Sequence, residues 1–387
     1  MSSTKREQYL PFGRPNFSDE EIAAISRVLR SGWVGMGPET IAFEAELARF
    51  MSVRHVVTVN SCTSALFLSL HVAGIGPGDE VICPSLTWCS TANVALYLRA
   101  TPVFCDIDAD TLCATPDTIL KHVTPRTRAV ILVHFGGFAM DVAALRRALP
   151  PNVVVIEDAA HALGAMYPDG SPVGGSGNLC CFSFYANKNL STGEGGAIAL
   201  NDNASAERLQ SLRQHALPLD AWKRFSHPET MLLSNQLTEL GYKMNYIDLQ
   251  ACIGRVQLRR QAEFASVRRE IAKRYVERLG KLAPKIRFQH NCADAKHALH
   301  LFVVLLPLEQ MQLNREDLIL GLRARNIGTT IHYQPLHTMP LYTGSTGPER
   351  LPVTEDVARR CVTLPISASM TMQDADDVID SFSAVYR

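Results

Sequence analysis

The chain has 387 residues, 47% of them hydrophobic, which suits a globular protein with one large domain and one smaller domain. Its 38 Lys and Arg residues balance 38 Asp and Glu residues, so no overall charge favours nucleic acid or an anionic membrane as a partner. No apolar run approaches the ~20 residues of a membrane helix, and the polar amino terminus lacks the apolar core of a signal peptide. We therefore expect a cytoplasmic protein. Its ten cysteines include no Cys-x-x-Cys pair, which favours reduced core residues over a metal site or a disulfide framework.

The first predicted element is an N-terminal helix. Ser18 and Glu21 form a capping box, and apolar residues at helical spacing follow until Gly32. After a glycine-rich loop at 31–38, strand-like and helical stretches alternate along the chain. The strand-like runs lie at 55–60, 80–83, 103–106, 129–133, 153–157, 179–184 and 197–200. Seven strands with helical crossovers predict an α/β fold built on a mostly parallel, doubly wound sheet.

Two segments that follow strands carry candidate ligand-binding residues. Cys62, Thr63 and Ser64 come after the first strand and lead into an apolar helix. The N–H groups and dipole of a helix N-terminus favour a phosphate, so we interpret these three as phosphate ligands, Cys62 mainly through its backbone. Ordinary helix capping is the alternative. Trp88 follows the second strand, where its ring could stack on a ligand ring or simply belong to the core.

A carboxylate and a lysine follow two later strands. A β-branched run ends in Asp158, with His161 three residues on, and the aromatic run at 179–185 leads to Lys188. If both strands lie in one parallel sheet, their carboxyl ends open on the same crevice. A lysine pressed against an apolar strand end has a lowered pKa and can attack an aldehyde, although a solvated surface lysine is the alternative. Pyridoxal 5′-phosphate needs such a pair, a lysine for the Schiff base and a carboxylate that keeps its ring nitrogen protonated.

The sequence of the second half of the chain predicts a boundary between two domains. A long polar loop between Arg213 and Glu239 carries Lys223 and Arg224, which either meet a diphosphate or remain solvated. A helical region at 247–282 leads out of a large domain at 1–260 into a small α+β domain at 261–387. In the small domain we expect strands at 301–306 and 329–332, a helix capped by Asn314 and a last helix after Thr371.

Three stretches resemble a known family: Glu-Asp-Ala-Ala-His-Ala-Leu-Gly at 157–164, Phe-Ser-Phe-Tyr-Ala-Asn-Lys-Asn-Leu at 182–190 and Gly-Glu-Gly-Gly at 193–196. They are similar to the DegT/StrS sugar-nucleotide aminotransferases, and the resemblance runs from about Pro11 to the C-terminus. Within the family it is closest to the branch that forms UDP-4-amino-4-deoxy-L-arabinose. The resemblance implies a fold-type I pyridoxal-phosphate transferase that exchanges L-glutamate for 2-oxoglutarate and aminates a keto-sugar nucleotide. It also implies a homodimer with shared active sites and a role in amino-sugar or glycan biosynthesis.

The resemblance assigns roles to individual residues. Lys188 and Asp158 would be catalytic, the first as the Schiff-base lysine and proton carrier, the second as partner of the ring nitrogen. The other implied cofactor contacts are His161 beside the ring, Trp88 stacked on it, and Cys62, Thr63, Ser64, Ser183 and the partner subunit's Asn245 around the phosphate. The family more often has glycine where this chain has Cys62. The segment at 331–338 resembles one that lines the sugar pocket, which makes His332, Tyr333 and His337 substrate candidates, although two histidines five residues apart are more often surface residues.

Several alternatives remain open at this stage. Some relatives are sugar dehydratases with histidine in place of the lysine, and others aminate cyclitol ketones. A pyridoxal-phosphate-binding regulatory protein without turnover would keep the same fold, whereas a nicotinamide enzyme would need a glycine fingerprint that is missing after the first strand. The nucleotide is also open, because UDP-linked 4-keto-pentoses and dTDP- or GDP-linked 4-keto-6-deoxyhexoses all fit.

Overall fold

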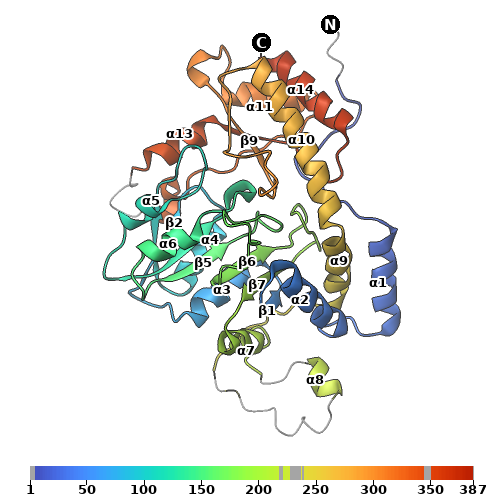
Figure 1. The fold of residues 1–387 in the computed structure, drawn as a ribbon, viewed down its shortest axis with the longest axis vertical. Coiled ribbons are helices and arrows are strands. Elements are labelled where there is room, and N and C mark those ends of the chain that lie inside the picture. Colours follow the sequence, from blue (N-terminus) through green and yellow to red (C-terminus); the bar gives the residue numbers. More distant parts are fainter. Residues whose placement is uncertain (1–4, 218–220, 227–236, 238, 344–349, 387) are drawn as a thin grey trace.

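The computed structural model describes residues 5–217, 221–226, 237, 239–343 and 350–386 (Figure 1). The strands are β1 (His55–Val59), β2 (Glu80–Pro84), β3 (Thr101–Cys105), β4 (Thr127–Val133), β5 (Val154–Asp158), β6 (Leu179–Ser183), β7 (Gly196–Leu200), β8 (Arg287–Phe288), β9 (Phe302–Leu305) and β10 (Cys361–Leu364). The α-helices are α1 (Asp19–Ser31), α2 (Pro38–Met51), α3 (Cys62–Val72), α4 (Ser90–Tyr97), α5 (Pro116–Leu120), α6 (Val142–Ala148), α7 (Asn203–Leu212), α8 (Ala221–Ser226), α9 (Asp248–Arg259), α10 (Gln261–Leu282), α11 (Arg315–Ala324), α12 (Pro340–Thr343), α13 (Pro352–Arg360) and α14 (Met372–Tyr386). Short 3-10 turns are η1 (Phe135–Gly137), η3 (Leu308–Gln310) and η4 (Leu336–Thr338).

The seven predicted strands form one sheet, in the order β1-β7-β6-β5-β4-β2-β3. The pairs β2–β3, β2–β4, β4–β5 and β5–β6 are parallel, whereas β7 runs antiparallel to both β1 and β6. The chain between β6 and β7, residues 184–195, contains no helix to carry it back across the sheet, so β7 starts where β6 ends. The prediction of a mostly parallel α/β sheet is confirmed. Because the chain reverses direction between β6 and β7, the segment that bears Lys188 stays at the carboxyl edge of the parallel strands.

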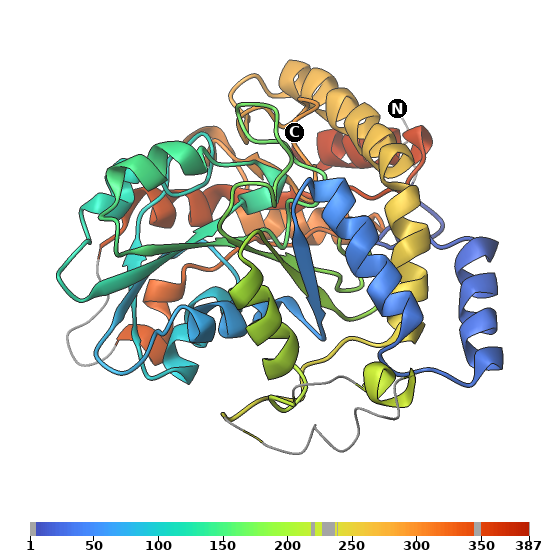
Figure 2. The same cartoon turned by 60° about the horizontal axis from the view of Figure 1, so that its bottom comes forward.

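Helices cover both faces of the sheet. The apolar side chains of α3, α4 and α7 pack with one face of the strands, and those of α2, α5 and α6 pack with the other. Figure 2 shows these two layers above and below the sheet. Strands enclosed in this way are apolar along their whole length, as the fully buried β7 illustrates. Within the described part of the chain, no helix is long and apolar enough to span a bilayer.

The C-terminal part carries a second, three-stranded antiparallel sheet in the order β10-β9-β8. The predicted strand at 301–306 is β9, and the predicted helix capped by Asn314 is α11. The strand predicted at 329–332 is wrong, because only Thr330 pairs there, in a single bridge with Thr363. Strand β9 pairs with β10 on one side and with β8 on the other, and sequence reasoning missed both of these strands.

Strand β9 joins the two parts of the molecule. Leu301, Val303 and Leu305 pack into the core that the large sheet shares with α2, α5 and α6, whereas Phe302 and Val304 pack into a core with α10, α11 and α14. This period-two alternation makes β9 apolar on both sides. Figure 1 shows α10, α11, α14 and the C-terminus together at one end of the molecule.

The N-terminal segment is shared between the two parts. Helix α1 packs against α9, but Leu10 ahead of it forms a bridge with Ile327 and belongs to the core of the C-terminal part. Arg260 is both the C-cap of α9 and the N-cap of α10, and the sequence predicted the domain boundary at this position. A division at residue 260 into two domains stays a prediction.

A buried ion pair ties the end of α7 to α2 and to strand β1 of the large sheet. Arg213 follows α7, is 2% exposed, pairs with Glu44 of α2 and donates to the carbonyl oxygen of Thr58 in β1 at 2.7 Å. Removing one member of such a pair leaves a desolvated charge.

We expect Arg213→Met to lower the free energy of unfolding by ~3–5 kcal/mol, because it leaves the Glu44 carboxylate desolvated without its cationic partner. The measurement is equilibrium denaturation in urea. Arg208→Met is the matched control, because the Arg208–Glu239 pair is largely exposed and such pairs contribute no more than ~1 kcal/mol. Equal losses in the two variants would contradict a structural role for the buried pair.

Candidate active site

A cavity of about 580 Å³ lies at the carboxyl edge of the large sheet. Asp158 reaches it from the end of β5 and Ser183 from the end of β6, while α3 points its N-terminus at it. The C-terminal part closes the other side. Of the residues predicted as site members, those that line this cavity are Cys62, Thr63, Trp88, Asp158, His161, Ser183, Lys188, His332 and Tyr333.

Lys188 lies in the loop between β6 and β7, where its N–H donates to the carbonyl oxygen of Tyr185 at 2.9 Å. Its side chain is partly buried, and its Nζ lies 3.4 Å from Nε2 of His300. Desolvation in the cavity lowers the pKa of Lys188 to about 8, against smaller opposing effects of Cys62 and Asp158. A substantial fraction of the amine is therefore free at mildly alkaline pH.

Asp158 is a buried carboxylate, 5% exposed. Thr91 donates to its Oδ2 at 2.8 Å, and the N–H of Ala160 donates to its Oδ1 at 3.2 Å. Burial raises the pKa of Asp158, and the hydrogen bond from Thr91 is the largest effect that opposes this. Asp158 forms no ion pair with any residue that the structure describes. It is therefore suited to a cationic N–H group on a ligand.

The N-terminus of α3 forms one wall of the cavity. Its N-cap is Ser61, whose side chain accepts from the N–H of Ser64 at 3.1 Å. The hydroxyl of Ser64 donates to Asn60 at 2.6 Å, and Ser64 does not line the cavity, unlike Cys62 and Thr63. The phosphate role of Ser64 stays a prediction, and the placement does not favour it, because its hydroxyl is engaged by Asn60 away from the cavity.

Gly196 at the start of β7 lets the strand approach this wall closely. A Cβ at this position would lie 2.5 Å from the carbonyl carbon of Ser61 and 2.6 Å from the nitrogen of Cys62. No side chain fits at that distance, so the contact requires glycine. The glycine-rich turn after Lys188 therefore brings β7 against the helix terminus that could hold an anion.

Two aromatic side chains and an imidazole also line the cavity. Trp88 is 61% exposed, and its ring centroid lies 6.0 Å from that of Tyr333. His161 accepts from the N–H of Gly136 at Nδ1, so its Nε2 carries the hydrogen and faces the Tyr333 hydroxyl at 3.2 Å. Burial lowers the pKa of His161 well below its usual value, which keeps the ring neutral.

The two histidines of the 331–338 segment separate in space. His332 lines the cavity, and its Nδ1 lies 2.8 Å from the hydroxyl of Thr363. Burial lowers the pKa of His332 to about 3. His337 does not line the cavity, because it packs against Ser85, with Nδ1 2.6 Å from the hydroxyl. A substrate contact by His337 is not favoured by this placement.

Asn245 also lies outside the cavity of its own chain. It forms a bridge with Val59, accepts from Lys243 at 2.6 Å and donates to the carbonyl oxygen of Tyr246 at 3.1 Å. The side chains of Lys223 and Arg224, proposed as diphosphate contacts, lie outside the described residues.

Sequence reasoning missed several residues that the structure brings to the site. Thr91 holds Asp158, His300 meets Lys188, and Asn187 lines the cavity with a buried Oδ1 that has no hydrogen-bond partner among the described residues. Asn187 lies inside the 182–190 segment that resembles the family, so the sequence could have indicated it. His300 lies ahead of β9, far from Lys188 along the chain, and no local pattern marks it.

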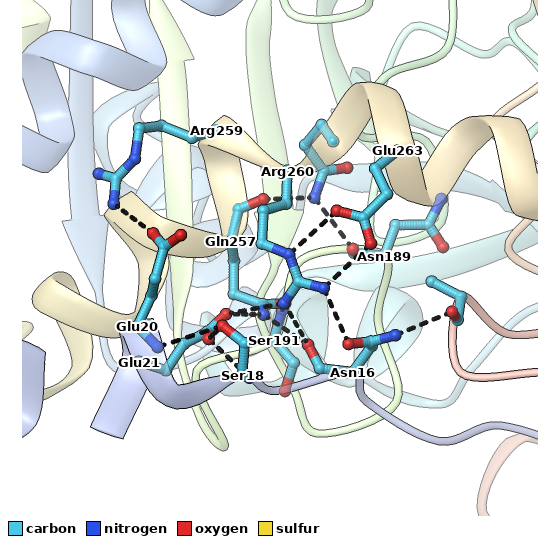
Figure 3. A network of polar contacts seen from close by, with 12 residues as sticks. Asn16, Ser18, Glu20, Glu21, Asn189, Ser191, Gln257, Arg259, Arg260 and Glu263 are labelled. Atoms are coloured by element: carbon cyan, nitrogen blue, oxygen red, sulfur yellow. Dashed lines mark hydrogen bonds and ion pairs between the residues drawn. The ribbon is translucent and has the colours of Figure 1, made fainter. Parts of the chain in front are cut away.

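A polar network anchors the segment that follows Lys188 (Figure 3). The carbonyl oxygen of Asn189 accepts from Gln261 at 3.1 Å, and the N–H of Ser191 approaches Oε1 of Gln257 at 3.5 Å. Gln257 in turn donates to Glu21 of α1 at 2.6 Å. The start of α1 and the α9–α10 junction therefore fix the backbone that carries the lysine.

Comparison with known proteins shows to which family this fold and site belong. Residues 15–383 match the DegT/DnrJ/EryC1/StrS aminotransferase family, which is nearly the whole chain. The chain belongs to this family. It is 41% identical to the spore coat polysaccharide biosynthesis protein SpsC of Bacillus subtilis, over 97% of each chain.

Solved structures of family members share the fold. The aminotransferase TlmJ from Streptoalloteichus hindustanus is 33% identical, with a TM-score of 0.87 over 97% of this chain and 98% of that one. The putative sugar aminotransferase Spr1654 from Streptococcus pneumoniae, solved in its PLP form, is 28% identical, with a TM-score of 0.87 over 98% of each chain. The predictions of the family, of fold type I and of a pyridoxal-phosphate-dependent aminotransferase are confirmed. The arabinose branch is not.

The residues of this DegT-family site fit pyridoxal phosphate. Asp158 offers a buried carboxylate that forms no ion pair with a described residue, and Lys188 offers an amine with a lowered pKa. The α3 N-terminus with Thr63 and nearby Ser183 offers donors for a phosphate. Trp88 and His161 line the same cavity.

We expect Thr91→Val to weaken the binding of pyridoxal phosphate by roughly tenfold, because Asp158 loses a hydrogen bond to its charged form and its pKa rises further. Titration of the cofactor-free protein with pyridoxal phosphate measures this. Thr354→Val is the matched control, since Thr354 is equally buried and donates to Asp106 at 2.7 Å, away from the cavity. Identical affinities in the two variants would show that Thr91 does not support Asp158.

Proposed function

We propose that this aminotransferase transfers the amino group of L-glutamate to a nucleotide-linked 4-keto-sugar and releases 2-oxoglutarate. The observation that carries the proposal is the placement of Lys188 and Asp158 on one cavity without an ion pair between them. The sugar rests on the relatives, because SpsC is named for polysaccharide biosynthesis and Spr1654 as a putative sugar aminotransferase. The amino-sugar product would then serve glycan biosynthesis in the cytoplasm.

The cofactor, when bound, withdraws electrons from the carbon that carries the amino group and stores that group between the two substrates. Lys188 takes the proton from Cα of the amino donor and returns it later in the transfer. Its pKa of about 8 leaves enough free amine to act as a base near neutral pH. With the cofactor bound, Asp158 would face the ring nitrogen, and Ser183, Thr63 and the Cys62 backbone would hold the phosphate.

The acceptor would enter from the side of His332 and Tyr333. His161 directs its Nε2–H at the Tyr333 hydroxyl, which leaves the hydroxyl hydrogen free for a sugar oxygen. His332 is held by Thr363 and stays neutral, so it offers a hydrogen bond without a charge. Uncharged polar groups of this kind suit a sugar better than a carboxylate.

We also propose a homodimer in which Asn245 completes the site of the partner subunit. Trp88 and Tyr185 line the cavity yet are 61% and 48% exposed, so its mouth is open in a single chain. Large exposed aromatic side chains at a site mouth are typical of an interface.

Lys188→Ala should abolish the visible band that the cofactor shows when linked to a lysine, and should lose at least the ~10²–10⁴ in rate that proton transfer supplies. Absorption spectra and single-turnover assays with L-glutamate measure both. Lys273→Ala is the control, because Lys273 is exposed and pairs only with Glu270 on α10. Normal transamination by Lys188→Ala would refute the proposal.

A panel of acceptors then tests the substrate class. UDP-linked 4-keto-pentose, dTDP- and GDP-linked 4-keto-6-deoxyhexoses and a cyclitol ketone are offered to the aminated enzyme, with the product position fixed by NMR. Turnover of the UDP-pentose would support the arabinose branch. Turnover of the cyclitol alone would overturn the sugar-nucleotide proposal, and cofactor binding without any transfer would point to a regulatory protein.

Subunit complementation tests the shared site. Asn245→Ala and Lys188→Ala should each be nearly inactive, but mixed dimers contain one site with both residues intact. After unfolding together and refolding at equal amounts, we expect activity to return to about a quarter of the wild-type value. No recovery, with dimers confirmed by sedimentation, would place Asn245 outside the partner's site.

A further inference from the structure

His300 is a buried residue that contacts the amine of Lys188. It precedes β9, is 5% exposed and lines the cavity. Its Nε2 lies 3.4 Å from Nζ of Lys188, and its ring centroid lies 4.5 Å from that of His161. The C-terminal part of the chain therefore supplies a polar contact to a lysine that is carried by the large sheet.

Asn189 determines which nitrogen of His300 carries the hydrogen. Its Nδ2 donates to the carbonyl oxygen of Ala298 at 2.7 Å, which orients the amide, and its Oδ1 then faces Nδ1 of His300 at 3.3 Å. An amide oxygen can only accept, so Nδ1 must be the N–H group. In a neutral imidazole, Nε2 is then an acceptor, and it faces Lys188.

The neighbourhood keeps this imidazole neutral. Burial lowers the pKa of His300 well below its usual value, and the charge of Lys188 acts in the same direction. The other ionisable groups that act on the pair are Arg268 on α10, His161 after β5, His332, Cys62 on α3 and Asp158 on β5. Of these, Asp158 and Cys62 favour the charged form of Lys188, whereas Arg268 favours the neutral form of His300.

We propose that His300 is a positioning residue for Lys188, whose amine donates a hydrogen to Nε2 of the neutral imidazole. This proposal rests on the role given above to Lys188. A free amine has two hydrogens and one lone pair, so a hydrogen bond to His300 turns the lone pair away from the imidazole and towards the cavity. Because the imidazole is an acceptor, it does not compete for that lone pair.

Asn189 links the contact between Lys188 and His300 to the backbone of the lysine loop. Its carbonyl oxygen accepts from Gln261, so the residue that sets the His300 tautomer is itself held by the α9–α10 junction, as its position in Figure 3 shows. Asn189 thus holds the loop after Lys188 through its backbone and orients His300 through its side chain.

The tautomer is tested first, on the cofactor-free wild-type protein. ¹⁵N-histidine spectra with long-range ¹H–¹⁵N couplings distinguish the two neutral tautomers and the imidazolium, with the His300 signal assigned by its absence in His300→Gln. We expect the Nδ1–H tautomer across pH 6.5–8.5. The Nε2–H tautomer or an imidazolium would overturn the proposal without reference to any activity.

The second test follows the titration of Lys188 in variants. Pulsed reductive methylation of the cofactor-free protein, read by mass spectrometry as a function of pH, gives the pKa of this lysine. An acceptor favours the ammonium form, so His300→Leu should lower the pKa by roughly half to one unit, the worth of one hydrogen bond. His300→Gln retains an acceptor and should restore most of the shift, and His290→Leu, at an exposed histidine, should change nothing.

An unchanged Lys188 titration in a folded His300→Leu protein would overturn the proposal. If that variant does not fold, the wild-type tautomer decides. Failure of the proposed function would look different, because a cofactor attached elsewhere or an absence of transfer would leave both the tautomer and the titration as predicted.

Discussion

The site depends on two ionisable groups that are desolvated in one cavity without neutralising each other. Asp158 is buried with a raised pKa, and Lys188 has its pKa lowered to about 8, yet no ion pair joins them. Holding both groups in this state costs stability, since each would be better solvated outside. A ligand with a cationic ring nitrogen and an aldehyde relieves both costs at once, which explains why one cofactor suits the site.

The rest of the structure keeps this arrangement in place with uncharged contacts. Thr91 supports Asp158, while neutral His161 and His300 line the cavity that holds the carboxylate and the amine. The reversal from β6 into β7 returns the lysine loop to the carboxyl edge, and Gly196 lets it press against the α3 terminus. Charged neighbours in place of these histidines would shift the pKa of Lys188 and disturb its use as a base.

Local pattern and one topological rule were enough to predict the centre of the site. The seven strands of the large sheet were read from β-branched runs, and parallel strands bring Asp158 and the segment of Lys188 to one edge. The rule on parallel strands does not predict whether a short apolar run pairs with another strand. For this reason Thr330 was assigned to a strand while β10 was missed. Side-chain direction was also beyond reach, because the sequence could not show that the hydroxyl of Ser64 donates to Asn60 rather than facing the cavity. His300 could not be predicted at all, since its contact with Lys188 arises only from the packing of the C-terminal part.

The central claim is that Lys188 carries the cofactor, and borohydride reduction followed by peptide mapping tests it most directly. The loaded protein is reduced, digested and searched for the mass of a pyridoxyl group. A label on the peptide that contains Lys188, lost when the protein is first treated with L-glutamate, is the result that this account predicts. A label on another lysine, or none on a protein that has bound the cofactor, would contradict it.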